Sequence, residues 1–203
     1  MAIPMKSLHR PDLYAWSSFD SDRNVDFNSV AWIRPEGNIL IDALPLSNHD
    51  REHLNSLGGA AWIIITNSDH IRDSKDIAQL TGAKIAAPSA EQETFPIPVD
   101  RWLSDGEELV PGLKVIEMQG SKTPGELALI LEETTLITGD LIRAHKAGSL
   151  MILPDAKLKN RAEAVASVRK LADFSKIETV LIGDGWSVFH NGYQQLQELA
   201  AAL

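Results

Sequence analysis

Short apolar runs, each closed by Gly, Pro, Asn or Asp, alternate along the chain with segments of helical periodicity. Runs rich in β-branched residues predict strands, and the turn residues mark where those strands end. In the first half of the chain the predicted strands are Leu13–Ser17, Phe27–Arg34, Asn38–Ala43, Trp62–Thr66 and Lys84–Ala87. Because the run that begins at Trp62 is apolar until its last residue, we expect it to be a central strand.

Turn and cap residues arrange these strands. Pro35-Glu36-Gly37 supplies a turn between the second and third strands and predicts an antiparallel hairpin. Ser47 can cap a helix that runs through Leu57, before two glycines. A second helix begins at Asp73 or Ser74, between two predicted strands, so the pattern there is a β-α-β unit.

The second half repeats the alternation of strands and helices. Its predicted strands are Leu113–Met118, Leu127–Glu132, Thr134–Thr138 and Thr179–Ile182, and its predicted helices are Arg161–Ala172 and a last helix from Asn191 onward. Two β-rich halves that each carry helices predict an α/β fold, a sandwich of sheets covered by helices on its outer faces. A length of 203 residues favours a single domain over residues 1–203.

Charge and composition narrow the possible partners. The formal net charge is -9 and no basic block is present, so we expect no nucleic-acid partner. The longest apolar run, Ala60–Ile65, is too short to span a bilayer, and the first twenty residues lack the core of a signal peptide, so a cytoplasmic protein without membrane contact is expected. The sequence has no cysteine, so any metal must be held by His, Asp, Glu or backbone oxygen.

Four predicted strands are followed by short polar stretches, which are Thr66–Asp73, Gly120–Gly125, Thr138–Asp140 and Ile182–Trp186. Functional residues often lie on such loops. Each stretch alone is typical of an ordinary turn, but their order and spacing carry more information.

This ordered set resembles the metallo-β-lactamase superfamily, from about residue 27 to residue 186. The resemblance implies an αβ/βα four-layer sandwich whose metal ligands come from loops after successive strands. In the family these loops read His-x-His-x-Asp-His, Gly-His-Thr-Pro-Gly, Thr-Gly-Asp and a final Gly-His. The frame is kept here, but most of the histidines are replaced.

In the later loops, only Asp140 aligns without ambiguity. Lys122 takes the place of the ligand His in the second loop, Asp140 matches the bridging carboxylate, and Asp184 takes the last ligand position. Since a protonated lysine cannot coordinate a metal, we expect the Lys122 ammonium to stand roughly where the metal sits. It would be salt-bridged to Asp140 and Asp184, near Asp69. The candidates for balancing the remaining carboxylates are Arg72 and Arg143.

The first loop aligns in two ways. Anchored on Thr66, it puts Asn67 and Asp69 at the paired His positions and Ile71-Arg72 at the Asp-His positions. Anchored on Asp69-His70, it keeps the final Asp-His and lacks two residues upstream. The sequence leaves both registers open.

The resemblance supports three functions. The first is a hydrolase-derived protein that acts on or binds a small anionic or ester-like molecule without the usual dinuclear zinc and without another cofactor. The second is a hydrolase that cleaves an ester, amide or phosphoester with one weakly held divalent ion (Mg, Mn or Zn), held by Asp69, His70, Asp140 and Asp184. The third is a non-catalytic binding or regulatory module, so enzymatic activity stays open.

The candidate site follows from these alignments. The candidate catalytic residues are Asp69, His70, Lys122 and Asp140, and the candidate ligand-binding residues are Asn67, Arg72, Asp73, Arg143, His145 and Trp186. The expected partner is a small-molecule ligand or substrate. Apolar residues of the last helix can cap the core or join two copies into an oligomer, and these residues are Leu196, Leu199, Ala200 and Leu203.

Overall fold

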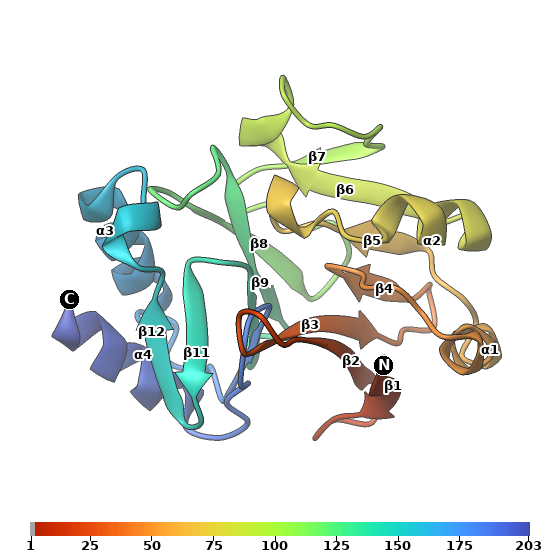
Figure 1. Cartoon of the computed structure of the whole chain (residues 1–203), viewed down its shortest axis with the longest axis horizontal. Helices are drawn as coiled ribbons and strands as arrows, with labels where there is room; N and C mark the ends of the chain where they lie inside the picture. The colour runs from red at the N-terminus through yellow and green to blue at the C-terminus, as the bar shows by residue number, and fades with distance from the viewer. Residues whose placement is uncertain (1–2) are drawn as a thin grey trace. The chain divides into compact units, whose positions relative to one another are not determined.

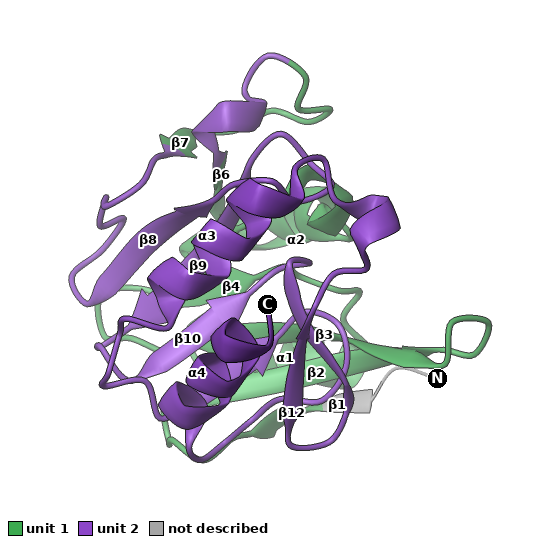
Figure 2. Ribbon diagram, turned by 90° about the vertical axis from the view of Figure 1, so that its left-hand side faces the viewer, with its two compact units in different colours: residues 1–87, 94–102 green, residues 88–93, 103–203 purple. Residues whose placement is uncertain are grey.

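Alternating strands and helices are found along the part of the chain that the computed structural model describes, residues 3–203 (Figure 1). The chain divides into two units, unit 1 with residues 1–87 and 94–102, and unit 2 with residues 88–93 and 103–203 (Figure 2). The single domain expected from the sequence stays a prediction. Within residues 3–203, no helix combines the length and the apolarity that crossing a membrane requires.

A seven-stranded sheet forms unit 1, and its strands follow the order of the chain. They are β1 (Ile3–Ser7), β2 (Leu13–Asp20), β3 (Val25–Trp32), β4 (Ile39–Ile41), β5 (Trp62–Ile64), β6 (Lys84–Pro88) and β7 (Arg101–Leu103). The predicted hairpin is confirmed, because β3 and β4 pair antiparallel. The predicted central strand is also confirmed, because β5 lies between β4 and β6 and is parallel to both.

Two helices and a short turn complete unit 1. They are α1 (Asn48–Ser56), α2 (Ser74–Thr81) and the 3-10 turn η1 (Ser68–His70). Ser47 caps α1 as predicted, because its side chain accepts the backbone N–H of Asp50. Leu54 of α1 and Ile77 of α2 join a buried cluster with residues of the sheet, so both helices pack on it through an apolar stripe.

Unit 2 contains a four-stranded sheet and a separate hairpin. Its strands are β8 (Leu113–Met118), β9 (Glu126–Leu131), β10 (Thr135–Thr138), β11 (Ile142–Lys146), β12 (Ser149–Ile152) and β13 (Thr179–Ile182). The sheet order is β13-β10-β9-β8, and β8, β9 and β10 form the expected antiparallel meander. β13 lies parallel to β10, with Thr138 opposite Ile182, and β11 pairs with β12.

The helices of unit 2 pack on this sheet and hairpin. They are α3 (Arg161–Leu171) and α4 (Gly192–Ala202), with the 3-10 turns η2 (Ser89–Glu91) and η3 (Asp155–Lys157). The Asn160 side chain caps α3 by accepting two backbone N–H groups. Leu196 and Leu199 are buried in a core cluster with strand residues, and Ala200 and Leu203 pack against it. The apolar face of the last helix therefore covers the core of unit 2.

Candidate functional site

In unit 1, Asp42 and His70 form a buried hydrogen-bonded pair. His70 Nδ1 lies 2.8 Å from Asp42 Oδ2, and His70 is only 4% exposed. Thr66 donates to the same carboxylate from its backbone N–H and from its hydroxyl, each at 2.7 Å. Because a carboxylate can only accept, the Nδ1 proton points to Asp42. In the neutral ring, Nε2 then carries the lone pair that can take a proton or bind a metal.

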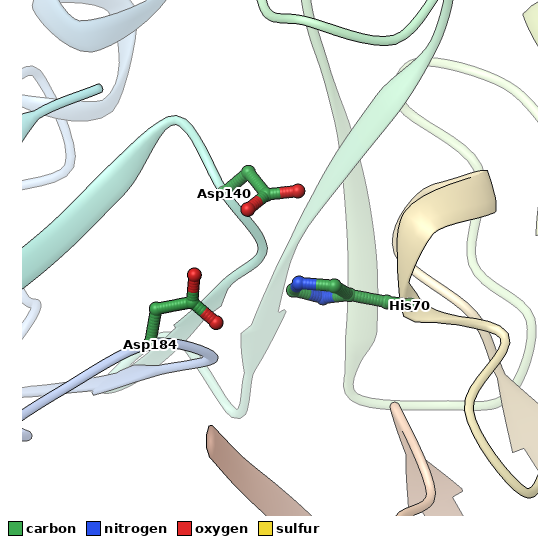
Figure 3. Close-up of side chains that lie close together, drawn as sticks. All are labelled: His70, Asp140 and Asp184. Atoms are coloured by element: carbon green, nitrogen blue, oxygen red, sulfur yellow. The ribbon is translucent and has the colours of Figure 1, made fainter. Parts of the chain in front are cut away.

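The parallel pairing of β4 with β5 brings Asp42 to the loop after β5. Asp42 directly follows β4, and its backbone N–H donates to Ile64 O at 2.9 Å. Its φ of 51° is left-handed, a conformation that Asp tolerates better than most residues. His70 ends η1, and its ring extends from that turn (Figure 3). A polar residue after an apolar strand is the only signal for Asp42 in the sequence, so sequence reasoning does not single it out.

Other predicted residues of this loop have structural contacts. Asn67 is fully buried and caps η1, because its side-chain oxygen accepts the Asp69 N–H at 3.0 Å. Asp69 itself is exposed. Arg72 donates from one guanidinium nitrogen to the backbone carbonyls of Asn28 and Asp42, at 2.5 and 2.9 Å. These contacts hold the loop against the middle of β3 and the end of β4.

In unit 2, Lys122 forms an ion pair with Asp140. Lys122 Nζ lies 2.9 Å from Asp140 Oδ2, and the Asp140 side chain is only 1% exposed while that of Lys122 is 28% exposed. This is the contact that the replacement of His by Lys predicted. It places a positive charge directly on the carboxylate that matches the bridging ligand of the resembled family.

Arg143 joins Asp140 to Asp184. One guanidinium nitrogen lies 2.5 Å from Asp184 Oδ2 and 3.3 Å from Asp140 Oδ1. Arg143 is 7% exposed and Asp184 is 5% exposed, so the pairs lie away from bulk water, where charges interact more strongly. Arg143 therefore balances the remaining carboxylates, as one of the two arginines proposed for that role.

Strand pairing explains why the two carboxylates meet. Asp140 and Asp184 each lie two residues beyond the neighbouring parallel strands β10 and β13, and the Gly183 N–H donates to Thr138 O at 3.0 Å. The two side chains therefore emerge at one edge of the sheet, with carboxylate oxygens within 4.8 Å of each other (Figure 3). Lys122 comes from the turn that joins β8 to β9.

The turn with Lys122 is held by a carboxylate that sequence reasoning missed, Glu126. Its oxygens accept the Ser121 hydroxyl at 2.6 Å and the Leu141 N–H at 2.8 Å. An acidic residue at the start of an otherwise apolar strand is its signal in the sequence. On the opposite side of the turn, the Gly125 N–H donates to Glu91 at 3.3 Å.

The remaining predicted site residues are Asp73, His145 and Trp186. Asp73 stands at the N-cap position of α2, without a side-chain capping bond. His145 is exposed on β11, and the Trp186 side chain is also exposed, at 59%. The backbone before Trp186 runs so close to Ala144 that a Cβ on Gly185 would overlap its carbonyl. That contact fixes the loop that carries Asp184.

The donors present do not fit a dinuclear zinc site. Within residues 3–203, the side chains with ligand atoms suited to a metal include His70 in unit 1 and Asp140 and Asp184 in unit 2. Dinuclear sites in the resembled family draw on several histidines, whereas one of those positions here is Lys122. Both unit 2 carboxylates are ion-paired, and an ammonium or a guanidinium offers a metal no lone pair.

Comparison with known proteins agrees with this fold. The family model described as the metallo-beta-lactamase superfamily matches residues 5–203. Curated protein sequences give no match. Solved structures with a similar fold include DIM-1 metallo-beta-lactamase, at a TM-score of 0.76 and 15% identity, covering 100% of this chain and 99% of that chain. They also include the metallo-beta-lactamase FIM-1 from Pseudomonas aeruginosa in its mono-zinc form, at a TM-score of 0.77 and 15% identity, covering 98% of this chain and 96% of that chain.

A metallo-beta-lactamase from Pontibacter korlensis is similar at a TM-score of 0.73 and 14% identity, covering 98% of this chain and 99% of that chain. At such identities the structures show the fold alone. They confirm the α/β, metallo-β-lactamase-like αβ/βα fold class that the loops predicted. Since the family model spans nearly the whole chain, this protein belongs to the metallo-β-lactamase superfamily.

Proposed function

We propose that this protein binds, and in a hydrolase-derived site acts on, a small anionic or ester-like molecule without the dinuclear zinc of its family. The main observation in support of this proposal is the ion pair between Lys122 Nζ and Asp140 Oδ2, at 2.9 Å. It neutralises the carboxylate that in the family bridges the metals. The chemistry of this site then rests on fixed positive charges of the protein itself.

The exposure of Lys122 supports a role in binding. Its side chain is 28% exposed while its partner carboxylate is 1% exposed, so solvent reaches part of the Lys122 side chain but hardly reaches the acid. An ammonium has three N–H donors. An oxygen of a carboxylate, a phosphoester or an ester can therefore accept one of them while Asp140 accepts another.

The charge balance of the cluster also favours an anion over a divalent cation. Two positive side chains, those of Lys122 and Arg143, form ion pairs with two carboxylates, those of Asp140 and Asp184. A cation entering this cluster meets two fixed positive charges at short range in partly dry surroundings. The carboxylates, already paired, repel an approaching anion far less than bare ones would.

Metal analysis tests the proposal. The experiment compares wild-type protein with Lys122→Ala and with a control, Lys176→Ala, which removes an exposed ion pair with Glu133. Each protein is equilibrated with zinc and desalted, and its bound zinc is measured by mass spectrometry. We expect tightly held zinc in Lys122→Ala alone, because only that change removes the charge next to Asp140. One tightly held ion per wild-type chain would overturn the proposal.

The ligand class needs its own measurement. p-Nitrophenyl acetate and p-nitrophenyl phosphate are offered to the wild type with a chelator present, and binding and release of nitrophenol are followed. We expect saturable binding of at least one of them, weakened in Lys122→Ala and unchanged in Lys176→Ala. Wild-type protein that binds neither compound would contradict the proposed ligand class.

A hydrolase with one weakly held divalent ion is the second candidate. It is favoured by the Asp42–His70 pair at 2.8 Å, because metal-binding histidines commonly donate their other ring N–H to a carboxylate. His70 would supply one ligand of such an ion through its Nε2. FIM-1, one of the solved structures of similar fold, is in a mono-zinc form. Zinc retained by the wild type and lost in His70→Ala would favour this candidate.

A further inference from the structure

Glu126 is a buried carboxylate at the first residue of β9 for which the proposed function gives no role. Its residue is 1% exposed, so it is almost fully removed from water. Such a burial is costly unless the charge is compensated by hydrogen bonds. Its Oε2 accepts the Ser121 hydroxyl at 2.6 Å, and its Oε1 accepts the Leu141 backbone N–H at 2.8 Å.

The two donors belong to different loops, and each adjoins a residue of the ion pair. Ser121 precedes Lys122 in the turn between β8 and β9, and Leu141 follows Asp140 after β10. Ser121 is itself fully buried, so its hydroxyl does not exchange freely with water. The Glu126 carboxylate thus connects the backbone next to the ammonium with the backbone next to its acidic partner.

Other hydrogen bonds hold the two ends of the turn between β8 and β9. The Gly120 carbonyl accepts the N–H groups of Lys159 and Asn160, near the start of α3, and the Lys159 N–H also donates to the Ser121 carbonyl. At the other end of the turn, the Gly125 N–H donates to Glu91. Those contacts fix the two ends of the turn to its surroundings. The bonds of Glu126 set the position of its middle relative to the strand end that carries Asp140.

We infer that Glu126 is a positioning residue that sets the distance between Lys122 Nζ and Asp140 Oδ2 by joining their two loops through Ser121 and Leu141. This inference rests on the proposed function, in which that ion pair takes the place of the metal. Glu126 acts through its neighbours and touches no ligand. When its bonds are removed, the turn shifts and the ammonium leaves Asp140.

Nuclear magnetic resonance of lysine ammonium groups tests the inference. In ¹⁵N-labelled wild type, the Lys122 ammonium correlation is assigned by its absence in Lys122→Ala. We expect this correlation to be lost or broadened in Glu126→Leu and in Ser121→Ala, because the ion pair that slows proton exchange is loosened. Glu126→Gln should retain it, since an amide can accept from Leu141 and donate to Ser121.

Controls separate positioning from general damage. Ser121→Ala removes a single hydroxyl and keeps the test valid where Glu126→Leu fails to fold. Thr179→Val removes another buried hydroxyl of unit 2, which donates to Phe189 O at 3.1 Å, and should leave the Lys122 correlation unchanged. A wild-type Lys122 correlation in folded Ser121→Ala and Glu126→Leu would overturn the inference.

Zinc content tells the two proposals apart. If Lys122→Ala takes up zinc, the proposed function stands, and the positioning role predicts that folded Ser121→Ala and Glu126→Leu also take up more zinc than wild type. Wild-type zinc content in both of those variants would then count against Glu126 alone. If Lys122→Ala takes up none, the proposed function fails whatever the Glu126 variants do.

Discussion

Asp42 accepts hydrogen bonds from the Thr66 backbone, the Thr66 hydroxyl and the His70 ring while only 2% of its surface is exposed. Hydrogen bonds to a carboxylate contribute more than bonds between neutral groups, and a buried donor left without its acceptor is costly. The Asp42 side chain therefore fixes both the loop after β5 and the orientation of His70.

Replacing Asp42 by Asn should lower the free energy of unfolding by about 2 kcal/mol or more, because at least one buried donor loses its acceptor. Asn also tolerates the left-handed backbone at this position, so the change reports on the hydrogen bonds. Urea unfolding provides the measurement. The exposed Asp22→Asn should stay within about 0.5 kcal/mol of wild type, and equal effects of the two changes would refute this prediction.

Asp73 should make the free energy of unfolding depend on pH. Partial burial, together with the charge of Asp76, raises the pKa of Asp73 above its usual 3.8. An acid whose folded pKa is raised destabilises the native state when it is ionised, so Asp73→Asn should be slightly more stable than wild type near neutral pH. This advantage should shrink as the pH falls through the raised pKa towards 3.8. Urea unfolding from about pH 7 to about pH 3 checks it, and a difference that does not change with pH would be contrary to it.

At the scale of elements, the turn before β9 is docked tightly on α3. Gly120 has a φ of 78°, and a Cβ there would overlap backbone atoms of Asn160 and Ala164 at the start of that helix. The turn sequence predicted a loop at Gly120–Gly125, but the helix that covers it lies about forty residues further along the chain. Position 120 therefore needs glycine for two separate reasons, its dihedral angle and its close approach.

Gly120→Ala should cost about 2 kcal/mol more than Gly106→Ala in the free energy of unfolding. Gly106 has nearly the same φ, 79°, but open space where its Cβ would stand, so the pair isolates the steric clash from the backbone strain. Thermal or urea unfolding of both variants measures the difference. Similar losses in the two would show that α3 and the turn can separate without cost.

Two of the elements that the sequence did not predict, β1 and β11, pair with the next strand of a hairpin and also contact residues distant in the chain. β1, β7, β11 and β12 were not predicted, whereas β8 and β13 were placed with the bounds they have. β1 is tied by the Met5 N–H to the buried Asp50 of α1, at 2.7 Å. Arg143 lies on β11 and pairs with Asp140 and with Asp184, although an arginine in a short polar run gives little signal for a strand.

On the scale of the whole molecule, each of the two units has helices packed on its own sheet, as the alternation of apolar and polar positions predicted. Leu196 of α4 is fully buried in the core cluster of unit 2, while Leu80 of α2 is 56% exposed. Leu196→Ala should lower the free energy of unfolding by about 2 to 5 kcal/mol, since it leaves a cavity in a packed core.

Leu80→Ala is the matched control, the same substitution on a helix of unit 1, and should change the free energy of unfolding by no more than about 0.5 kcal/mol. Urea unfolding of both variants compares them directly. A small effect for Leu196→Ala would mean that α4 contributes little to the core, against the burial observed.

By itself, the sequence determined most strands and helices, because periodicity and turn residues are local signals. The order of its polar loops, through their resemblance to a known family, implied the fold class and the pairing of Lys122 with Asp140. Tertiary structure alone decided that Asp42 holds His70 and that Glu126 joins two loops, and it showed which of the two candidate arginines, Arg143, bridges Asp140 and Asp184. These contacts unite residues that are far apart in the chain. Their energies arise only after strand pairing has removed them from water, and no local pattern encodes that event.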